Sequence, residues 1–227
     1  MIYVMSDIHG NEARFRDILK QIKFTKKDTL YILGDVVDRG EGGIRILRQI
    51  MKTPNMKMLL GNHEHMMLDA LYYTEERAPG LFNKIRLWYS NGGQFTHNQL
   101  KHYTKAVRQE ILEFIGDLPL NIEVEVNGNQ YILVHAGIVE NYRYANDKYR
   151  SSTEYAVWTR DADTVEIPKG KTLIFGHTPT WEFQEEEIMK ICKWDDRIGI
   201  DCGCPYTDIG RLACLRLDDM KEFYSDV

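Results

Sequence analysis

The sequence has no apolar run long enough to span a lipid bilayer, and it begins without the basic, apolar leader that directs secretion. We therefore expect a cytoplasmic protein that does not bind a membrane. The chain also lacks an excess of basic residues, because 29 Lys and Arg stand against 34 Asp and Glu. The formal net charge of -5 disfavours nucleic acid as a partner. Any phosphate group must then be held by a few local side chains.

Cysteine is also scarce, and its positions are Cys192, Cys202, Cys204 and Cys214. We expect these thiols to be reduced, because no secretion signal accompanies them. Cys202-Gly203-Cys204 has no second Cys or His pair at zinc-finger spacing. Small buried side chains near a strand end are therefore favoured over a structural zinc site.

No linker rich in Pro, Ser or Gly divides the chain, and no block of charge or fixed-period repeat does so either. With 227 residues, of which 43% are hydrophobic, the length suits one α/β domain with a substantial core. We therefore predict a single domain over residues 1–227. The stretch at about 69–118 carries few motifs and has helical periodicity, so we interpret it as a helical insertion or cap.

The first part of the chain repeats one pattern. Residues 2–5, 29–33 and 56–60 are short apolar runs typical of buried strands, and each is followed by a polar loop and then by helical periodicity. Asn11 is the expected N-cap of the first helix, with Glu12 in its first turn. Three successive β-loop-α units place their polar loops at one edge of one sheet.

The second part alternates in a way that favours hairpins. Ile122, Val124 and Val126 alternate before Asn127-Gly128, and the apolar run Tyr131 to Val134 follows it, so this dipeptide is a strong hairpin signal. Further strands are expected at 172–175 and 197–200, and a hairpin at 212–224. These patterns predict a second, mostly antiparallel sheet. The expected fold class is α/β, with two mixed β-sheets packed face to face and flanking helices.

The strongest regularity is that apolar strands end in short loops, flanked by glycine, that carry His, Asp or Asn. These residues are Asp7, His9, Asp35, Asp38, Asn62, His63, His135 and His177. A lone histidine after a strand is usually structural, but the recurrence favours a shared site. The set is too large for one tetrahedral ion and suits two ions that share a carboxylate. Two such metals can stabilise both oxygens of an in-line displacement and activate water, which is the chemistry of phosphate ester hydrolysis.

The motifs resemble those of a known family. Asp7-x-His9-Gly10, Gly34-Asp35-x-x-Asp38-Arg39-Gly40, Gly61-Asn62-His63-Glu64, His135-Ala136-Gly137 and Gly176-His177-Thr178-Pro179 look like the signature of calcineurin-like metallophosphoesterases. Their Asp-Arg-Gly and Asn-His-Glu forms resemble the PPP-type serine/threonine protein phosphatases. Trp88-x-x-Asn91-Gly92-Gly93, Leu118-Pro119 and Trp158-Thr159-Arg160 resemble the bacterial and phage branch typified by bacteriophage lambda phosphatase.

The resemblance implies a role for each matching residue. Asp7 and His9 would hold the first metal, Asp35 would bridge, and Asn62, His135 and His177 would hold the second. His63 would be the general acid, oriented by Asp38, while Arg39 and Arg160 would bind the phosphate. The cofactors would be two divalent metal ions, commonly Mn²⁺, with Fe or Zn also compatible with the ligands. Water would attack directly, without a phosphoenzyme, and Asp38 is expected to favour the imidazolium form of His63.

Three functions fit these residues. The first is a serine/threonine protein phosphatase, or one of broader specificity, acting on a phosphorylated protein or small phosphoester. The second is a symmetrical dinucleoside polyphosphate hydrolase, for which aromatic residues of the insertion (Tyr72, Tyr73, Trp88 and Tyr89) would be base platforms instead of cap core. The third is a non-catalytic scaffold, which would not need to keep His63 and every ligand. One departure from the family pattern, Cys202 and Cys204 in a loop that usually reads Asp-Thr-Gly-Ala, suggests that activity is sensitive to oxidants.

Overall fold

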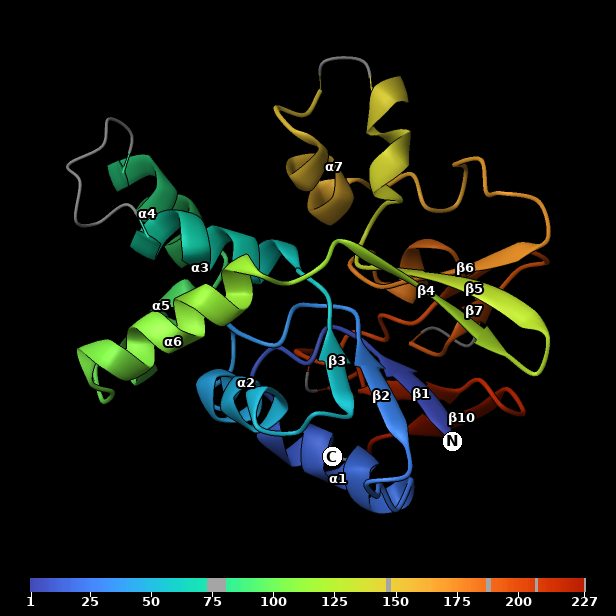
Figure 1. Ribbon diagram of the computed structural model, residues 1–227, viewed down its shortest axis with the longest axis horizontal. Helices are drawn as coiled ribbons and strands as arrows, with labels where there is room; N and C mark the ends of the chain where they lie inside the picture. Colours follow the sequence, from blue (N-terminus) through green and yellow to red (C-terminus); the bar gives the residue numbers. More distant parts are fainter. Residues whose placement is uncertain (73–80, 146–147, 187–188, 207, 227) are drawn as a thin grey trace.

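The computed structural model describes residues 1–72, 81–145, 148–186, 189–206 and 208–226. In this part of the chain two five-stranded sheets pack against each other, with helices outside them (Figure 1). The strand order is β10-β9-β1-β2-β3 in the first sheet and β4-β5-β6-β8-β7 in the second. The predicted α/β fold of two mixed sheets with flanking helices is confirmed.

The first sheet contains the three β-loop-α units. Its strands are β1 (Ile2–Met5), β2 (Thr29–Ile32), β3 (Met56–Met58), β9 (Ala213–Arg216) and β10 (Lys221–Tyr224). Strands β1, β2 and β3 are parallel, joined by helices α1 (Glu12–Gln21) and α2 (Gly43–Met51). Asn11 caps α1 as predicted, because its side chain accepts a hydrogen bond from the backbone N–H of Arg14 at 3.1 Å. The carboxyl ends of these strands therefore meet at one edge.

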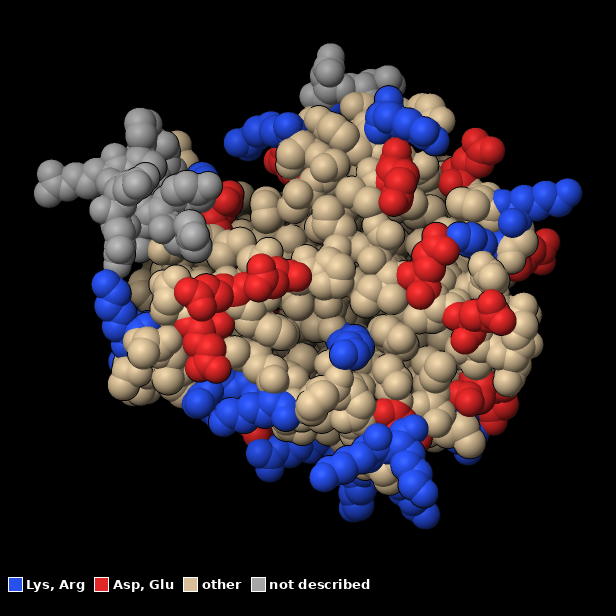
Figure 2. All heavy atoms as spheres, in the orientation of Figure 1, with Lys and Arg blue, Asp and Glu red and all other residues tan. Residues whose placement is uncertain are grey.

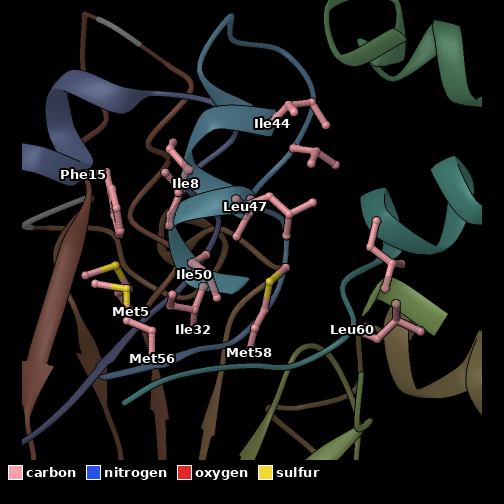
Figure 3. Packing of buried hydrophobic residues seen from close by; sticks show 14 of the residues in the cluster. Met5, Ile8, Phe15, Ile32, Ile44, Leu47, Ile50, Met56, Met58 and Leu60 are labelled. Carbon is pink, nitrogen blue, oxygen red and sulfur yellow. The ribbon is translucent and has the colours of Figure 1, made fainter. Parts of the chain in front are cut away.

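Both faces of the first sheet are covered along β1 and β2, which explains why these two strands are mostly apolar. Along β1, Tyr3 and Met5 belong to the core cluster shared with α1 and α2, whereas Val4 belongs to the cluster between the sheets. Figure 3 shows Met5 packed beside Phe15 of α1, with Leu47 of α2 farther along the same cluster. This packing fixes the strands whose ends carry the polar loops.

The second sheet is mixed, not mostly antiparallel, so that prediction was wrong. Its strands are β4 (Asn121–Val126), β5 (Asn129–Val134), β6 (Lys171–Phe175), β7 (Cys192–Lys193) and β8 (Arg197–Gly199). The β4–β5 hairpin turns at Asn127 and Gly128, whose φ angles of 52° and 82° suit the predicted Asn-Gly turn. However, β6 is parallel to both β5 and β8, because long connections return the chain to the same end. The C-terminal hairpin β9–β10 joins the first sheet through β1.

Within the stretch at about 69–118, the residues that the structure describes are mainly helical, as predicted. Its helices are α4 (Leu81–Ser90), α5 (Gly93–Leu100) and α6 (Lys105–Gly116), and they lie together with α3 (Asn62–Tyr72) on one side of the sheets (Figure 1). Helix α3 begins at Asn62, so Asn62 and His63 lie in the first turn of a helix and not in a loop. The chain between β5 and β6 adds two elements that were not predicted, the 3₁₀ helix η1 (Val139–Tyr144) and helix α7 (Ser152–Trp158).

The surface carries both signs of charge. On the face in Figure 2, Lys and Arg side chains gather at the edge where α1 and α2 lie, and acidic side chains lie among basic ones elsewhere. Among the described residues, no helix combines the length and the apolar character that crossing a bilayer would need.

Candidate metal centre

Strand ends from both sheets converge on the carboxylate of Asp35. One oxygen, Oδ2, lies 3.6 Å from His9 Nε2 and 3.8 Å from His63 Nε2. The other oxygen, Oδ1, lies 3.5 Å from His135 Nε2. All these side chains are buried. Asp35 therefore faces imidazoles on both of its oxygens, as a carboxylate shared between two metal ions would.

Asp7 and His9 form one side of this arrangement. Asp7 Oδ1 lies 3.9 Å from His9 Nε2, and Asp7 Oδ2 accepts hydrogen bonds from Ser6 Oγ at 2.5 Å and from the backbone N–H of His177 at 3.0 Å. The Nδ1 of His9 lies 3.2 Å from the carbonyl oxygen of Val37, to which it can donate. That bond leaves the lone pair of Nε2 facing the carboxylates, which is how metal-binding histidines are usually oriented.

Asn62, His135 and His177 form the other side. Asn62 Oδ1 lies 2.9 Å from His135 Nε2 and 3.0 Å from His177 Nδ1. His135 Nδ1 lies 2.6 Å from the carbonyl oxygen of Leu33, and this bond orients Nε2 toward Asn62 and Asp35. The structure therefore brings together every residue predicted to bind metal. Two overlapping groups of donor atoms, each lying within 4.8 Å of one another, can hold a metal: Asp35 with His9 and His63, and Asp35 with His135 and His177.

The backbone around the pocket is left-handed at several non-glycine residues, a feature that the sequence did not predict. The residues are Asp7, His9, Asp35, Asp38, Arg39 and His177, with φ between 46° and 69°. Such conformations cost about 1–3 kcal/mol each and collect at functional sites, where the surrounding structure enforces them. These backbone conformations therefore lower the stability of the folded protein, and they place the side chains in the pocket.

Glu64 holds the loop of Asp35 in place, although sequence reasoning gave it no role. Its carboxylate accepts hydrogen bonds from the backbone N–H groups of Asp35 at 2.8 Å, Val36 at 2.8 Å, Val37 at 3.1 Å and Gly61 at 3.2 Å. A Cβ at Gly61 would lie 2.3 Å from Asp35 Oδ1, so only glycine permits this approach. The signal for Glu64 was its place in the Asn-His-Glu motif.

Burial sets the electrostatics of the centre. It raises the pKa of Asp35 well above the usual carboxyl value and lowers the pKa of His9 and of His177 well below the usual imidazole value. Neutral imidazole is the form that binds metal, and divalent cations would compensate the buried carboxylates. Nitrogen and oxygen donors without thiolate suit Mn, Fe or Zn. The residues present therefore fit a pair of divalent metal ions.

Asp201 is a second residue that sequence reasoning left out. It follows β8, lines the same pocket as Asp7 and Asp35, and is buried. Burial raises its pKa well above the usual value, and the charge of Asp7 acts in the same direction. Its position after an apolar strand was the available signal. The neighbouring Cys202 and Cys204 are buried free thiols and, among the described residues, belong to neither metal-binding group.

The remaining pocket residues can handle a proton and a phosphate. His63 Nδ1 lies 2.8 Å from Asp38 Oδ2, while Arg39 Nη2 donates to His63 Nε2 at 3.2 Å. Arg39 and Arg160 both line the pocket, and Arg160 pairs with Glu182 at its exposed rim. The predicted catalytic residues therefore lie beside the metal-binding groups.

Comparisons with known proteins agree with this chemistry. A family model for the calcineurin-like phosphoesterases matches residues 1–201. Serine/threonine-protein phosphatase 2 of Salmonella typhimurium is 31% identical over 188 residues, which are 78% of each chain. The symmetrical bis(5'-nucleosyl)-tetraphosphatase of Acidovorax ebreus is 32% identical over 144 residues, which are 62% of this chain and 45% of that enzyme. The chain thus spans less than half the length of the tetraphosphatase that it matches.

A solved structure is similar in fold. The crystal structure of a proposed diadenosine tetraphosphatase has a TM-score of 0.63 at 18% identity and covers 98% of this chain and 91% of its own. Since the family model matches most of the chain and the pocket carries donors of matching chemistry, this chain belongs to the calcineurin-like phosphoesterase family.

Proposed function

We propose that this chain is a serine/threonine protein phosphatase that hydrolyses phosphate monoesters with two divalent metal ions. The observation that carries this proposal is that one pocket combines metal-binding groups centred on Asp35, a His63–Asp38 pair and two arginines. A metal pair alone can serve many reactions. Together with a proton donor and two guanidinium groups, it suits hydrolysis of a phosphoester.

Asp7 and His9 would hold the first metal, Asn62, His135 and His177 would hold the second, and Asp35 would be a ligand common to both. Bound metals supply Lewis-acid stabilisation of the phosphoryl charge and activate water near neutral pH, with Mn²⁺ the expected ion. The protein contributes the orientation of these ligands through Val37, Leu33 and Glu64.

Arg39 and Arg160 bind the non-bridging oxygens of the phosphate. A guanidinium group matches the spacing of two phosphate oxygens, and both arginines line the pocket that Asp7 and Asp35 also line. In doing so Arg39 exchanges its hydrogen bond to His63 Nε2 for bonds to the substrate. The imidazole nitrogen that faces the pocket then becomes available to the leaving group.

Once Arg39 has released it, Nε2 of His63 takes up a proton from the solvent, and His63 then donates this proton to the leaving oxygen. Asp38 accepts a hydrogen bond from Nδ1 and so fixes which nitrogen faces the substrate. The phosphoryl group transfers directly to water, and no residue of the chain forms a covalent bond to phosphorus.

Two substrate classes compete, and the shared length of the relatives favours the first. The match to serine/threonine-protein phosphatase 2 extends over 78% of both chains, whereas the match to the tetraphosphatase stops at 45% of that enzyme. The similarity to the tetraphosphatase, at 32% identity, makes symmetrical hydrolysis of a dinucleoside polyphosphate the second candidate. Trp88 gives this alternative no base platform, because it is fully buried.

The test is a comparison of substrates on metal-depleted enzyme to which Mn²⁺ has been returned. The substrates are a phosphoserine peptide, a phosphotyrosine peptide, p-nitrophenyl phosphate and diadenosine tetraphosphate, with chelated enzyme and His63→Asn as controls. We expect Mn²⁺-dependent release of phosphate, with the phosphoserine peptide turned over faster than the dinucleotide. Faster release of ADP from the dinucleotide would establish the second candidate, and no metal-dependent hydrolysis of any substrate would refute both.

A further inference from the structure

We propose that the helical insertion completes the catalytic apparatus, because its Trp88 is a positioning residue that fixes Asp38 against His63. Through Asp38, Trp88 sets how well His63 protonates the leaving oxygen. This inference rests on the function proposed above and assigns part of it to helix α4, which contributes no metal ligand.

The contact between Trp88 and Asp38 is buried and direct. The indole Nε1 lies 3.1 Å from Asp38 Oδ1 and 2.9 Å from Oδ2, and both side chains are fully buried. Oδ2 also lies 2.8 Å from His63 Nδ1. If the carboxylate rotated away, a buried indole N–H and a buried imidazole N–H would both lose their acceptor, which is unfavourable. The indole therefore locks the carboxylate in the orientation that holds His63.

The insertion also holds the backbone of the same loop. Thr96 Oγ1 of α5 accepts a hydrogen bond from the backbone N–H of Asp38 at 2.8 Å, and the carbonyl oxygen of Gly92 accepts one from Arg39 at 3.3 Å. Asp38 and Arg39 are both left-handed, with φ of 69° and 63°. The insertion therefore supplies hydrogen-bond partners to two of the residues whose left-handed backbone is unfavourable on its own.

The indole is itself fixed from within the insertion. His97 stacks on it with ring centroids 5.8 Å apart and an interplanar angle of 25°, and the hydroxyl of Tyr89 hydrogen-bonds to His97 Nδ1. A Cβ at Gly93 would lie 2.5 Å from the indole ring, so the backbone of α5 presses directly against it. Helices α4 and α5 thus form a rigid support for one hydrogen bond.

This role predicts a dependence on the leaving group. p-Nitrophenolate departs readily without a proton, whereas phenolate needs protonation much more, and the two phosphate esters have nearly the same shape. Loss of positioning at His63 should therefore slow phenyl phosphate far more than p-nitrophenyl phosphate. Loss of packing or of metal would slow both substrates equally.

The central experiment is Trp88→Phe, which keeps an aromatic ring but removes the N–H donor. We expect its kcat on phenyl phosphate to fall about tenfold more than its kcat on p-nitrophenyl phosphate, with KM and metal content unchanged. Trp194→Phe is the matched control, because Trp194 is 37% exposed and packs against Phe175 and Phe183 away from the pocket. Adding Trp88→Phe to His63→Asn should cause no further selective loss, because both changes act through one group.

If Trp88→Phe does not fold, Thr96→Val and Thr96→Ser test whether the insertion positions Asp38. Valine removes the acceptor for the Asp38 backbone N–H and serine keeps it, so only Thr96→Val should show the selective loss. Equal losses on the two substrates, or none, in whichever variant folds would overturn the inference while leaving the phosphatase proposal intact. Wild-type protein that hydrolyses neither ester with Mn²⁺ present would instead refute the proposed function.

Discussion

The two halves of the pocket are built by different means. The metal-binding half comes from strand ends of both sheets, and its imidazoles are oriented by backbone carbonyls of Leu33 and Val37. The half that contains Asp38 and His63 is completed by side chains of the helical insertion, Trp88 and Thr96. Sheet geometry therefore sets the first half, and the packing of helices sets the second.

This difference means that metal binding and proton donation should be separable by mutation. Changes in the strand-end half should remove metal and stop all turnover. Changes in the insertion should leave metal in place and slow only those substrates whose leaving group needs a proton.

Asp35→Asn should have the largest effect, because Asp35 is the carboxylate that faces both metal-binding groups. We expect loss of bound metal, measured by elemental analysis, and a fall in turnover of about a thousandfold on every substrate. Asp196→Asn, which changes an exposed carboxylate, should retain metal and activity. Two metals per chain and normal turnover in Asp35→Asn would contradict the shared-carboxylate arrangement.

His63→Asn should lower turnover by about 10²- to 10⁴-fold while keeping both metals. His63 could be either a general acid or a metal ligand, because its Nε2 also lies within reach of a metal held by His9 and Asp35. Elemental analysis separates the two roles. Loss of one metal from this variant would make His63 a ligand and would move it to the strand-end half.

The same contrast explains what could be predicted from the sequence. Asp7, Asp35 and His135 each stand within two residues of the end of an apolar run, so the strand and its ligand can be recognised together. The Trp88–Asp38 bond joins residues 50 positions apart and depends on how α4 packs. No spacing in the sequence encodes that contact, and Trp88 was marked only by the resemblance of the Trp-x-x-Asn-Gly-Gly motif and by its aromatic ring.

The pairing of the strands was a second feature that the sequence could not predict. The apolar residues at 122–126 and 131–134 predicted two strands, which the structure contains, but they could not show which neighbour each strand would take. The parallel pairing of β6 and the attachment of β9–β10 to the first sheet both depend on contacts distant in sequence. Glu64 and Asp201 were missed for a related reason, since their partners are backbone groups and charges that only the folded chain assembles.

Glu64→Gln should lower both the stability and the metal affinity of the strand-end half, because Glu64 holds the loop of Asp35. The glutamine side chain would place its own N–H group against backbone N–H groups whose hydrogen bonds the carboxylate of Glu64 now accepts. We therefore expect the free energy of unfolding to fall by about 2–3 kcal/mol. Metal affinity should fall by about 10- to 100-fold, as for other residues that orient metal ligands. Denaturant unfolding and metal titration measure the two effects, and Glu113→Gln on the exposed side of α6 is the control. Unchanged metal affinity would show that the loop of Asp35 keeps its conformation without the hydrogen bonds to Glu64.

Gly93→Ala tests the insertion with a smaller perturbation. The new methyl group would meet the Trp88 ring at 2.5 Å, so we expect about 1–3 kcal/mol of destabilisation. Gly116→Ala is the matched control, because a Cβ there has no neighbour within 4 Å and alanine favours a helix by about 0.5–1 kcal/mol. Thermal unfolding of both variants gives the comparison. Equal stability of the two would mean that α4 and α5 adjust freely, and the insertion would then be a poor support for Asp38.

The thiols of Cys202 and Cys204, beside the pocket, should have the smallest effect on activity. We therefore no longer expect the oxidant sensitivity that these two residues suggested in the sequence. Burial raises the pKa of Cys204 from 9.0 to about 12, and burial also raises the pKa of Cys202 well above its usual value. Protonated, buried thiols are weak nucleophiles, so the native protein should react slowly with iodoacetamide at pH 8. Hydrogen peroxide should inactivate wild type and Cys202→Ser at the same rate.

The pH dependence of stability provides an independent check on Cys204. In the unfolded chain its thiol ionises near 9.0, but in the folded protein only near 12, so the folded state holds the proton more tightly. Its contribution to stability is therefore complete below about pH 9 and is lost as the pH rises toward 12. Cys204→Ser should flatten the alkaline limb of an unfolding-midpoint curve. A limb as steep as that of wild type would mean that this thiol is accessible to water, and oxidant sensitivity would then return as a property of the pocket.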